Sequence, residues 1–300
     1  MKSFTLENKH LKVVLLDYGA LLHQLWVKDR NGDFVNVIQG LPSPEDYKKD
    51  SWSRGAVIGR FAGRLENPIQ IDFEPIAIEH HEGVLLHSGS SGWGTKTWTC
   101  EKQHPNAVLF SITCPEGASG FPGTVNATMH YKIENTSLHL KYSAKTDRPT
   151  HINLTNHAYF NLNPKGKIKD QILHIQADEF LYLKNNLVPS GKRVNVSHTP
   201  FDFRTPKKIN NTVLDDYFVL NSKAKIAASL SDPSSGIVME TLTDQPGVVV
   251  FTPPHFEAIC FETQKFSNTP NIASFPSTLI RSNEVYQQNT EFRFSIKTES

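Results

Sequence analysis

Two side chains of this sequence have the types that move protons in catalysis. Glu262 directly follows the apolar run at residues 258–261, and a carboxylate buried without a partner is so costly that it must be paired or functional. His157 lies in a dense polar and aromatic stretch at residues 151–162. Histidine changes its charge near neutral pH, and it shares with carboxylates the role of general acid or base. A histidine taken alone is more often structural, whereas a carboxylate within an apolar strand needs a partner.

Three further charged or titratable residues stand in unusual local settings. Arg64 closes the glycine-rich segment GRFAGR at residues 59–64, His87 precedes a turn of small residues, and Asp215 precedes the apolar residues 217–220. Each has an ordinary explanation as well. Arg64 could form a surface ion pair, His87 a structural hydrogen bond, and Asp215 a turn or helix cap.

Common catalytic motifs are absent from the sequence. The segment at residues 89–95 has the spacing of a phosphate-binding loop, but Thr95 stands where the lysine is required. The pair His81-Glu82 lacks the second histidine of a zinc-protease motif, and no Gly-x-Ser-x-Gly elbow occurs. The three cysteines are sparse and show no CxxC spacing. A disulfide framework or a structural zinc site is therefore not expected.

The composition excludes several classes of partner. The chain has 300 residues, with 31 Lys and Arg against 30 Asp and Glu and a formal net charge of +1. Proteins that bind nucleic acids or anionic membranes usually carry a basic excess, so neither partner is expected. The first ten residues contain no apolar segment of a signal peptide, and the longest apolar runs are too short to span a bilayer. We therefore expect a cytoplasmic protein.

The hydrophobic pattern predicts strands almost throughout the chain. Apolar and polar residues alternate at 138–142 and 292–296, which places each apolar set on one face of a sheet. One short helix is predicted to start at Ser43-Pro44, where an N-cap serine precedes a proline and two acidic residues, and to end before residues 51–53. Further strands bounded by turn residues are expected at 12–16, 124–133, 194–198 and 247–252.

These elements predict an all-β protein with a large antiparallel β-sandwich or barrel. No linker or repeat divides the sequence, and strand and turn signals continue to its last ten residues, so we expect a single domain over residues 1–300. No long helix or heptad pattern offers an association signal. A monomer is the default expectation, and a dimer is possible.

Several ordered segments of the sequence resemble the aldose 1-epimerase (galactose mutarotase) family. The most specific are NLTNHAYFNL at residues 153–162 and ETQKF at 262–266, the latter followed by Pro270-Asn271 and Phe275-Pro276. Supporting matches are VPSG at 188–191, FDFR at 201–204 and LTDQPG at 242–247. The resemblance extends from residues 18–20 to residues 290–294.

The resemblance implies a β-sandwich with its site in a groove on one face, and neither a metal nor a redox or organic cofactor. It also implies a role for each matching position: Glu262 as general base, His157 as general acid, His87 as a second histidine that contacts the sugar, and Arg64, Asp215 and Gln245 as groups that hold sugar hydroxyls. Two positions depart from the family pattern. Gly63 precedes Arg64 where the family commonly has Asn, and Ser88 follows His87 where it commonly has Gly. The loss of Asn leaves the preferred sugar open.

An aldose changes its anomer by opening its ring and closing it on the other face. Ring opening needs one proton to leave the C1 hydroxyl while another reaches the ring oxygen, which a carboxylate and a protonated imidazole can do together. A sugar-phosphate epimerase is the first alternative, and it would need basic groups such as Arg54, Arg60 or Arg204 to hold the phosphate. A non-catalytic sugar-binding protein and a glycosidase that uses Asp215 with Glu262 are weaker alternatives.

Overall fold

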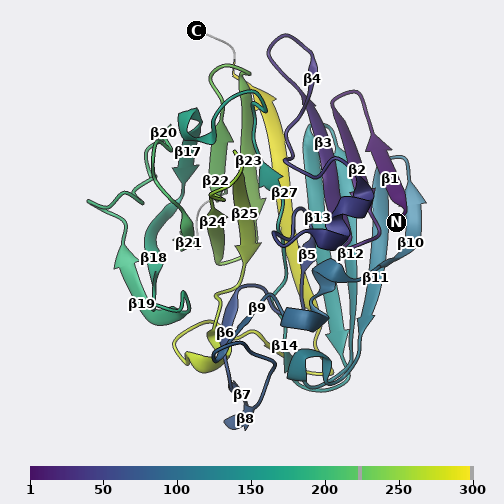
Figure 1. Cartoon of the computed structure of the whole chain (residues 1–300), viewed down its shortest axis with the longest axis vertical. Helices are drawn as coiled ribbons and strands as arrows, with labels where there is room; N and C mark the ends of the chain where they lie inside the picture. The colour runs from purple at the N-terminus through teal and green to yellow at the C-terminus, as the bar shows by residue number, and fades with distance from the viewer. Residues whose placement is uncertain (222–224, 298–300) are drawn as a thin grey trace.

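The computed structural model describes residues 1–221 and 225–297 of the chain (Figure 1). Its largest layer is a nine-stranded antiparallel sheet in which β27 (Tyr286–Ile296) lies between β13 (Ser137–Thr146) and β23 (Ile237–Thr243). The strands expected at 138–142 and 292–296 fall inside β13 and β27 and are confirmed. The sheet continues through β12 (Val125–Glu134), β11 (Ala107–Cys114) and β10 (Thr99–His104) on one side, and through β22 (Ala228–Ser231), β17 (Ile172–Ile175) and β20 (Lys207–Lys208) on the other.

The opposite layer consists of two antiparallel sheets that meet at their edges. A bridge between Ile38 and Phe160 joins them. The four-stranded sheet contains β1 (Ser3–Glu7), β2 (Leu11–Leu16), β3 (Leu21–Lys28) and β4 (Phe34–Asn36). The six-stranded sheet has the order β16 (Tyr159–Phe160), β25 (Ile259–Gln264), β24 (Gly247–Phe251), β21 (Asp215–Leu220), β18 (Ala177–Leu183) and β19 (Pro189–Asn195).

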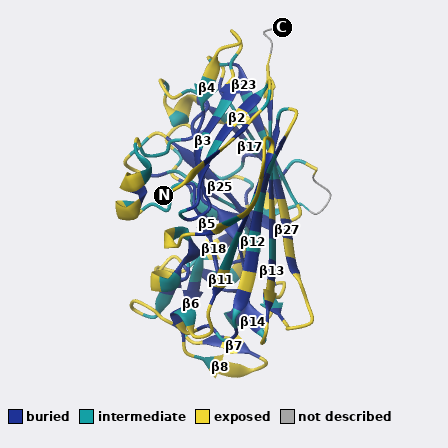
Figure 2. Cartoon of the chain, turned by 90° about the vertical axis from the view of Figure 1, so that its right-hand side faces the viewer, coloured by how far each residue is buried: buried dark blue, intermediate teal, exposed yellow. Residues whose placement is uncertain are grey.

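A continuous apolar core fills the space between the two layers, as the buried ribbon in Figure 2 indicates. The core forms because successive residues along a strand point to opposite faces of the sheet, so that every second side chain is buried. In β12, buried and more exposed residues alternate along the strand, so that Met129 and Tyr131 enter the core while His130 between them faces outward. The predicted antiparallel β-sandwich is therefore confirmed.

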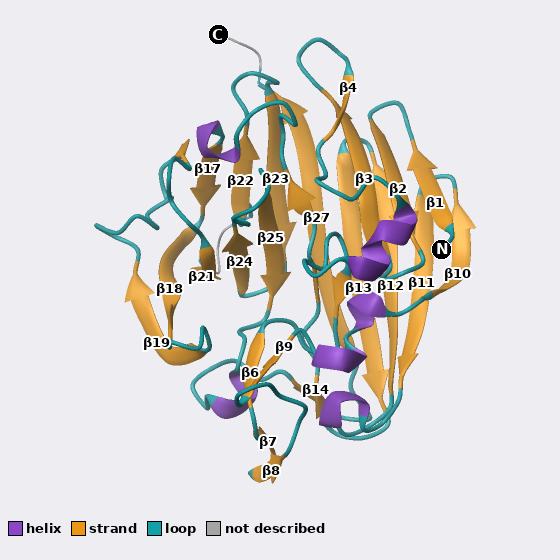
Figure 3. Cartoon of the chain, in the orientation of Figure 1, coloured by secondary structure: helices purple, strands orange, loops and turns teal. Residues whose placement is uncertain are grey.

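The segments outside the three large sheets contain short two-stranded pairs. These pairs are β5 (Val57–Ile58) with β15 (Thr155–Asn156), β6 (Arg64–Glu66) with β9 (Val84–Leu86), β7 (Ile69–Ile71) with β8 (Glu74–Ile76), and β14 (Thr150–His151) with β26 (Leu279–Ile280). The helical segments of the described chain are all 3₁₀ turns (Figure 3). They are η1 (Pro44–Lys49), η2 (Gly89–Ser91), η3 (Trp93–Thr95), η4 (Ala118–Gly120), η5 (Ile168–Asp170) and η6 (Thr269–Asn271).

The predicted helix start is confirmed, and one predicted strand is largely wrong. Ser43 caps η1 by accepting a hydrogen bond from the backbone of Glu45, and the segment ends at Lys49. The strand expected at 194–198 ends at Asn195 in the structure, because the chain turns there: Thr199 N–H donates to the carbonyl of Val196, and His198 has a φ of 62°. No helix among the described residues is long and apolar enough to cross a membrane.

Candidate active site

A cavity of about 200 Å³ opens on the six-stranded sheet, and it collects most of the expected site residues. Arg64, His87, His157, Asp215 and Glu262 all line it, although they come from five segments that are distant in sequence. The remaining lining residues are Ser51, Trp52, Ser53, Gly63, Leu86, Tyr159, Leu183, Leu187, Pro189, Tyr217, Val249, Phe251, Gln264 and Ser267.

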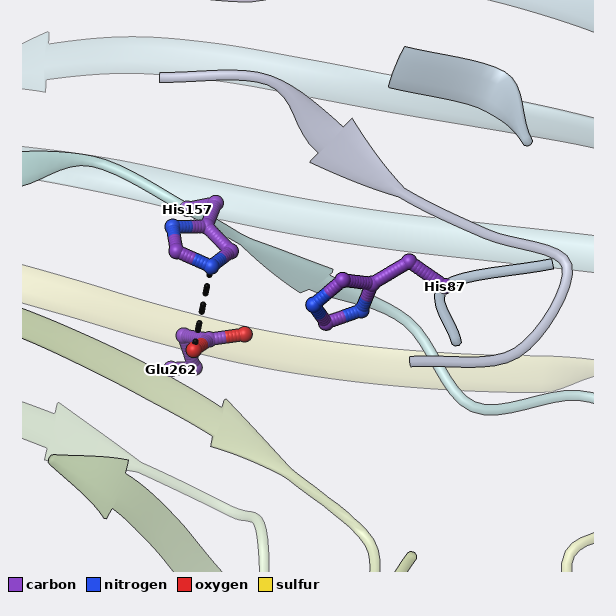
Figure 4. Close-up of side chains that lie close together, drawn as sticks. All are labelled: His87, His157 and Glu262. Carbon is purple, nitrogen blue, oxygen red and sulfur yellow. Dashed lines mark ion pairs between the residues drawn. The ribbon is translucent and has the colours of Figure 1, made fainter. Parts of the chain in front are cut away.

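Glu262 and His157 face each other at the base of this cavity, with Oε1 and Nε2 3.4 Å apart (Figure 4). Glu262 lies on β25, the strand between β16 and β24, and pairs with Val249 of β24. The backbone of His157 is fixed by two hydrogen bonds, one to the carbonyl of Ala56 and one from the N–H of Gly55. Both side chains are nearly buried, with 4% and 6% of the residue exposed. The carboxylate that the sequence placed after an apolar run therefore has a partner.

Burial shifts the two pKa values in opposite directions. It raises the pKa of Glu262 to about 8; the negative charge of Asp215 acts in the same direction, and Arg64 opposes it. Burial lowers the pKa of His157 to about 4. Between these values the pair holds one proton, and burial favours that proton on the carboxyl group. This location of the proton differs from the expectation of a protonated imidazole, because a cation at His157 would lose more solvation than a neutral ring.

His87 completes a group of three titratable side chains. Its ring stands edge-on to that of His157, with the centroids 5.5 Å apart. Its Nδ1 accepts a hydrogen bond of 3.2 Å from the Gly63 N–H. Burial lowers the pKa of His87 well below its usual value, and the nearby His157 and Arg64 act in the same direction. The neutral ring therefore carries its proton on Nε2, which makes that nitrogen a hydrogen-bond donor.

The hydrogen bond from the Gly63 N–H to His87 Nδ1 also bears on whether this group of side chains could bind a metal ion. Ligand atoms of His87, His157 and Glu262 lie within 4.8 Å of one another, a grouping that could in principle hold a cation. A histidine that ligates a metal through Nε2 normally donates its Nδ1–H to a second group. At His87 the Nδ1 is instead an acceptor from Gly63. The chemistry of this donor set thus suits hydrogen bonding and proton transfer better than metal ligation.

Arg64 and Asp215 form the polar side of the cavity. Arg64 begins β6 and pairs with Leu86 of β9, while Asp215 begins β21 and pairs with Phe251 of β24. Their Nη2 and Oδ2 atoms are 3.6 Å apart, and 25% and 36% of the two side chains are exposed. An ion pair of that exposure contributes little to stability. Its unfilled donor and acceptor positions can instead bind a polar ligand.

Gln245 is the one expected site residue that the structure does not bring into the cavity. It lies in the turn before β24, and its Nε2 donates to Oδ1 of Asp244 at 2.6 Å. The position on β24 that faces the cavity, opposite Glu262, belongs to Val249. The geometry therefore does not support a sugar-holding role for Gln245.

The structure also adds residues that the sequence reasoning missed. Trp52 and Phe251 stack with their centroids 6.2 Å apart and form an apolar wall of the cavity. Gln264 and Ser267 line it near Gly63. Gln264 lies in one of the quoted motifs, so the motif could have indicated it, whereas nothing local in the sequence marks Trp52 or Ser267.

Comparisons with known proteins agree with this geometry. The family model described as aldose 1-epimerase matches residues 2–293. The chain is 31% identical to the galactose mutarotase of Bos taurus, over 99% of this chain and 94% of the relative, and 28% identical to the aldose 1-epimerase of Escherichia coli K12, over 96% and 93%. Among solved structures, it is similar to the GalM/aldose epimerase homologue from C. elegans (TM-score 0.95, 26% identity, 99% of both chains) and to galactose 1-epimerase from Lactobacillus acidophilus (TM-score 0.87, 26% identity, 98% and 94%).

Proposed function

This chain belongs to the aldose 1-epimerase family, and from that premise we propose that it interconverts the α and β anomers of a free aldohexose, such as galactose or glucose, with Glu262 and His157 as its acid–base pair. It is an isomerase of the mutarotase class. The observation that carries the assignment of the pair is their opposed, buried placement at 3.4 Å in a cavity of sugar size.

The proton count of the pair suits both halves of the reaction. Ring opening begins when Glu262 accepts the C1 hydroxyl proton and His157 delivers a proton to the ring oxygen. The open-chain sugar then faces a protonated carboxyl group and a neutral imidazole, which is the arrangement that burial favours. Rotation about the C1–C2 bond presents the other aldehyde face, and the two groups exchange roles to close the ring. One proton shared within the pair is sufficient for a complete cycle.

Before the first step the proton must lie on His157, so the resting pair transfers it from Oε1 to Nε2. The 3.4 Å separation is slightly longer than a hydrogen bond and shortens with a small side-chain movement. A bound sugar assists, because its C1 hydroxyl donates to the carboxylate and its ring oxygen accepts from the imidazolium. His87, with its proton on Nε2, would donate to a ring substituent beside this pair.

The charges of the cavity favour a free sugar over a sugar phosphate. Arg64 is the only Lys or Arg that lines the cavity among the described residues, and Asp215 already faces it. The other arginines considered for a phosphate are engaged elsewhere. Arg54 stacks on Phe256 at 3.9 Å, Arg60 is buried and donates to backbone carbonyls, and Arg204 pairs with Asp202. The carboxyl groups would also repel a phosphate.

Polarimetry on freshly dissolved sugars tests this function. The protein should accelerate the anomerisation of α-D-galactose or α-D-glucose, with a kcat/KM at least about tenfold higher than for the corresponding 6-phosphates, a difference of about 1.4 kcal/mol. The spontaneous rate is subtracted in each buffer. A preference for the 6-phosphates would favour the sugar-phosphate alternative, and binding without any acceleration would favour the non-catalytic one.

Replacing Arg64 with alanine should weaken substrate binding more than turnover. A hydrogen bond from a charged group contributes about 1.5–3 kcal/mol, so we expect KM to rise about 10- to 100-fold with kcat changed much less. Initial rates over a range of galactose concentrations measure both constants. Arg204→Ala, which removes an arginine that does not line the cavity, is the matched control. A loss of kcat at unchanged KM would contradict the binding role.

A further inference from the structure

Ser267 occupies the space beside Gly63 that a side chain at position 63 would need. Gly63 has a φ of 82°, and a Cβ built on it would lie 2.0 Å from Ser267 Oγ and 2.8 Å from Ser267 Cβ. These distances are shorter than real Cβ contacts, so a side chain at position 63 would require the Ser267 side chain to move. Gly63 itself adjoins Arg64, and its N–H donates to His87. The Ser267 hydroxyl therefore lies among the groups already assigned to the sugar.

Gln264 and Ser267 form a hydrogen-bonded pair that retains one donor and one acceptor for a further partner. The Nε2 of Gln264 donates to Ser267 Oγ at 3.1 Å, which leaves the hydroxyl proton of Ser267 free to donate. The Oε1 of Gln264 is buried and has no hydrogen-bond partner in the part of the chain that the structure describes. Gln264 is fully buried and Ser267 is 5% exposed, and both line the cavity.

An unsatisfied buried amide oxygen costs about 1–3 kcal/mol, and proteins rarely leave one without a reason. Other buried polar atoms without partners belong to residues that do not line the cavity, such as Arg60, Thr155, Thr241 and Gln245. In Gln264 the orphaned acceptor instead stands next to a hydroxyl donor at the site. A sugar hydroxyl, which donates once and accepts twice, satisfies such a donor–acceptor pair.

We propose that Ser267 and Gln264 bind a ring hydroxyl of the sugar, with the Ser267 O–H as donor and Gln264 Oε1 as acceptor. This inference rests on the proposed function and deepens it. Glycine has no side chain at position 63. Ser267, in the loop after β25, places its hydroxyl in the space that a side chain at position 63 would occupy. Ser267 and Gln264 then act as specificity-determining residues, because they distinguish sugars by the hydroxyl that they hold.

A comparison of Ser267→Ala with the wild type on deoxy sugars tests the contact. On galactose and glucose, the loss of one neutral hydrogen bond should lower kcat/KM about threefold to tenfold, mainly through KM. On the one deoxy sugar that lacks the bound hydroxyl, the two proteins should differ by less than about twofold. The 2-, 3-, 4- and 6-deoxy analogues are assayed in turn. Ser143→Ala, on the nine-stranded sheet, is the control for a serine outside the cavity.

An equal loss on every analogue would overturn the inference, because a purely structural effect does not depend on the substrate's hydroxyls. The same comparison by calorimetric titration of sugar binding gives the answer independently of turnover. Wild-type protein that binds sugars without anomerising them contradicts the proposed function alone. Wild-type protein that anomerises them, but shows no coupling to Ser267 on any analogue, contradicts this inference alone.

A second pair of variants tests the steric part of the inference. Gly63→Asn should lower both kcat/KM and the melting temperature, because its Cβ collides with the Ser267 side chain. Adding Ser267→Gly removes the colliding atoms, and asparagine tolerates a positive φ better than most residues. The double variant should therefore recover most of the lost melting temperature, whereas kcat/KM should stay low because the Ser267 hydroxyl is gone. Additive losses in the double variant would show that the two positions do not share one space.

Discussion

Replacing Glu262 with glutamine is expected to lower kcat for anomerisation about 10²–10⁴-fold, the size of the contribution that general acid–base catalysis makes. Glutamine keeps the shape of the side chain but can neither accept the C1 proton nor return it. Since Glu262 is buried and burial disfavours its charged form, the neutral amide should not destabilise the fold. Polarimetry gives the rate, and thermal unfolding monitored by circular dichroism verifies that the protein is folded.

Strand β21, separated from β25 by β24 in the same sheet, offers a matched control for this substitution. Burial raises the pKa of Asp216 to about 6, so it too is a perturbed carboxyl group, but it does not line the cavity. Its Oδ2 accepts a hydrogen bond from the Asp215 N–H, which an asparagine oxygen can also accept. Asp216→Asn should therefore keep nearly full activity. Wild-type rates in the Glu262 variant, or an equal loss in both variants, would rule out Glu262 as the base.

The strands were predictable because their burial follows from local sequence, whereas the site depends on pairings between distant segments. In β13 and β27, alternation alone identifies the buried face. The cavity forms because Arg64 pairs opposite Leu86, next to His87, and because Glu262 pairs opposite Val249. No local sequence pattern predicts which residues of two distant segments pair with each other. The sequence motif could therefore supply the identities of the proposed acid and base, but not their separation or orientation.

Gln245 shows the limit of reasoning from a motif. The family resemblance of the segment at residues 242–247 implied that Gln245 holds a sugar hydroxyl. In β24, however, the face toward the cavity is set by the pairing with β25, and it presents Val249 and Phe251. The location of the shared proton was equally beyond the sequence, since it depends on how far Glu262 and His157 are removed from water.

His157→Asn provides the second large effect, and its pH dependence identifies the role of the residue. In the wild type, kcat/KM should be level between pH values of about 4 and 8, where the pair holds one proton. Below about 4 the pair gains a second proton and loses its base. Above about 8 it loses its only proton and with it the acid. The rate therefore falls on both sides.

Asparagine cannot hold the proton, so His157→Asn should lower kcat about 10²–10⁴-fold. The alkaline limb of the pH–rate profile, which falls in the wild type, should rise in this variant. The residual reaction depends on ionised Glu262 as base, whose pKa is raised by burial, and its rate should rise with pH where the wild-type rate falls. His151→Asn removes another buried histidine of similarly lowered pKa outside the cavity, and it should keep the wild-type profile. Rates are measured from pH 4 to 10 with the spontaneous reaction subtracted. An alkaline limb that still falls in His157→Asn would mean that the essential proton belongs to another group. If the Glu262–His157 pair holds that proton, deprotonation at high pH removes the acid when His157 is present, so the rate falls. Without His157, the same deprotonation only generates the base Glu262, so the rate rises.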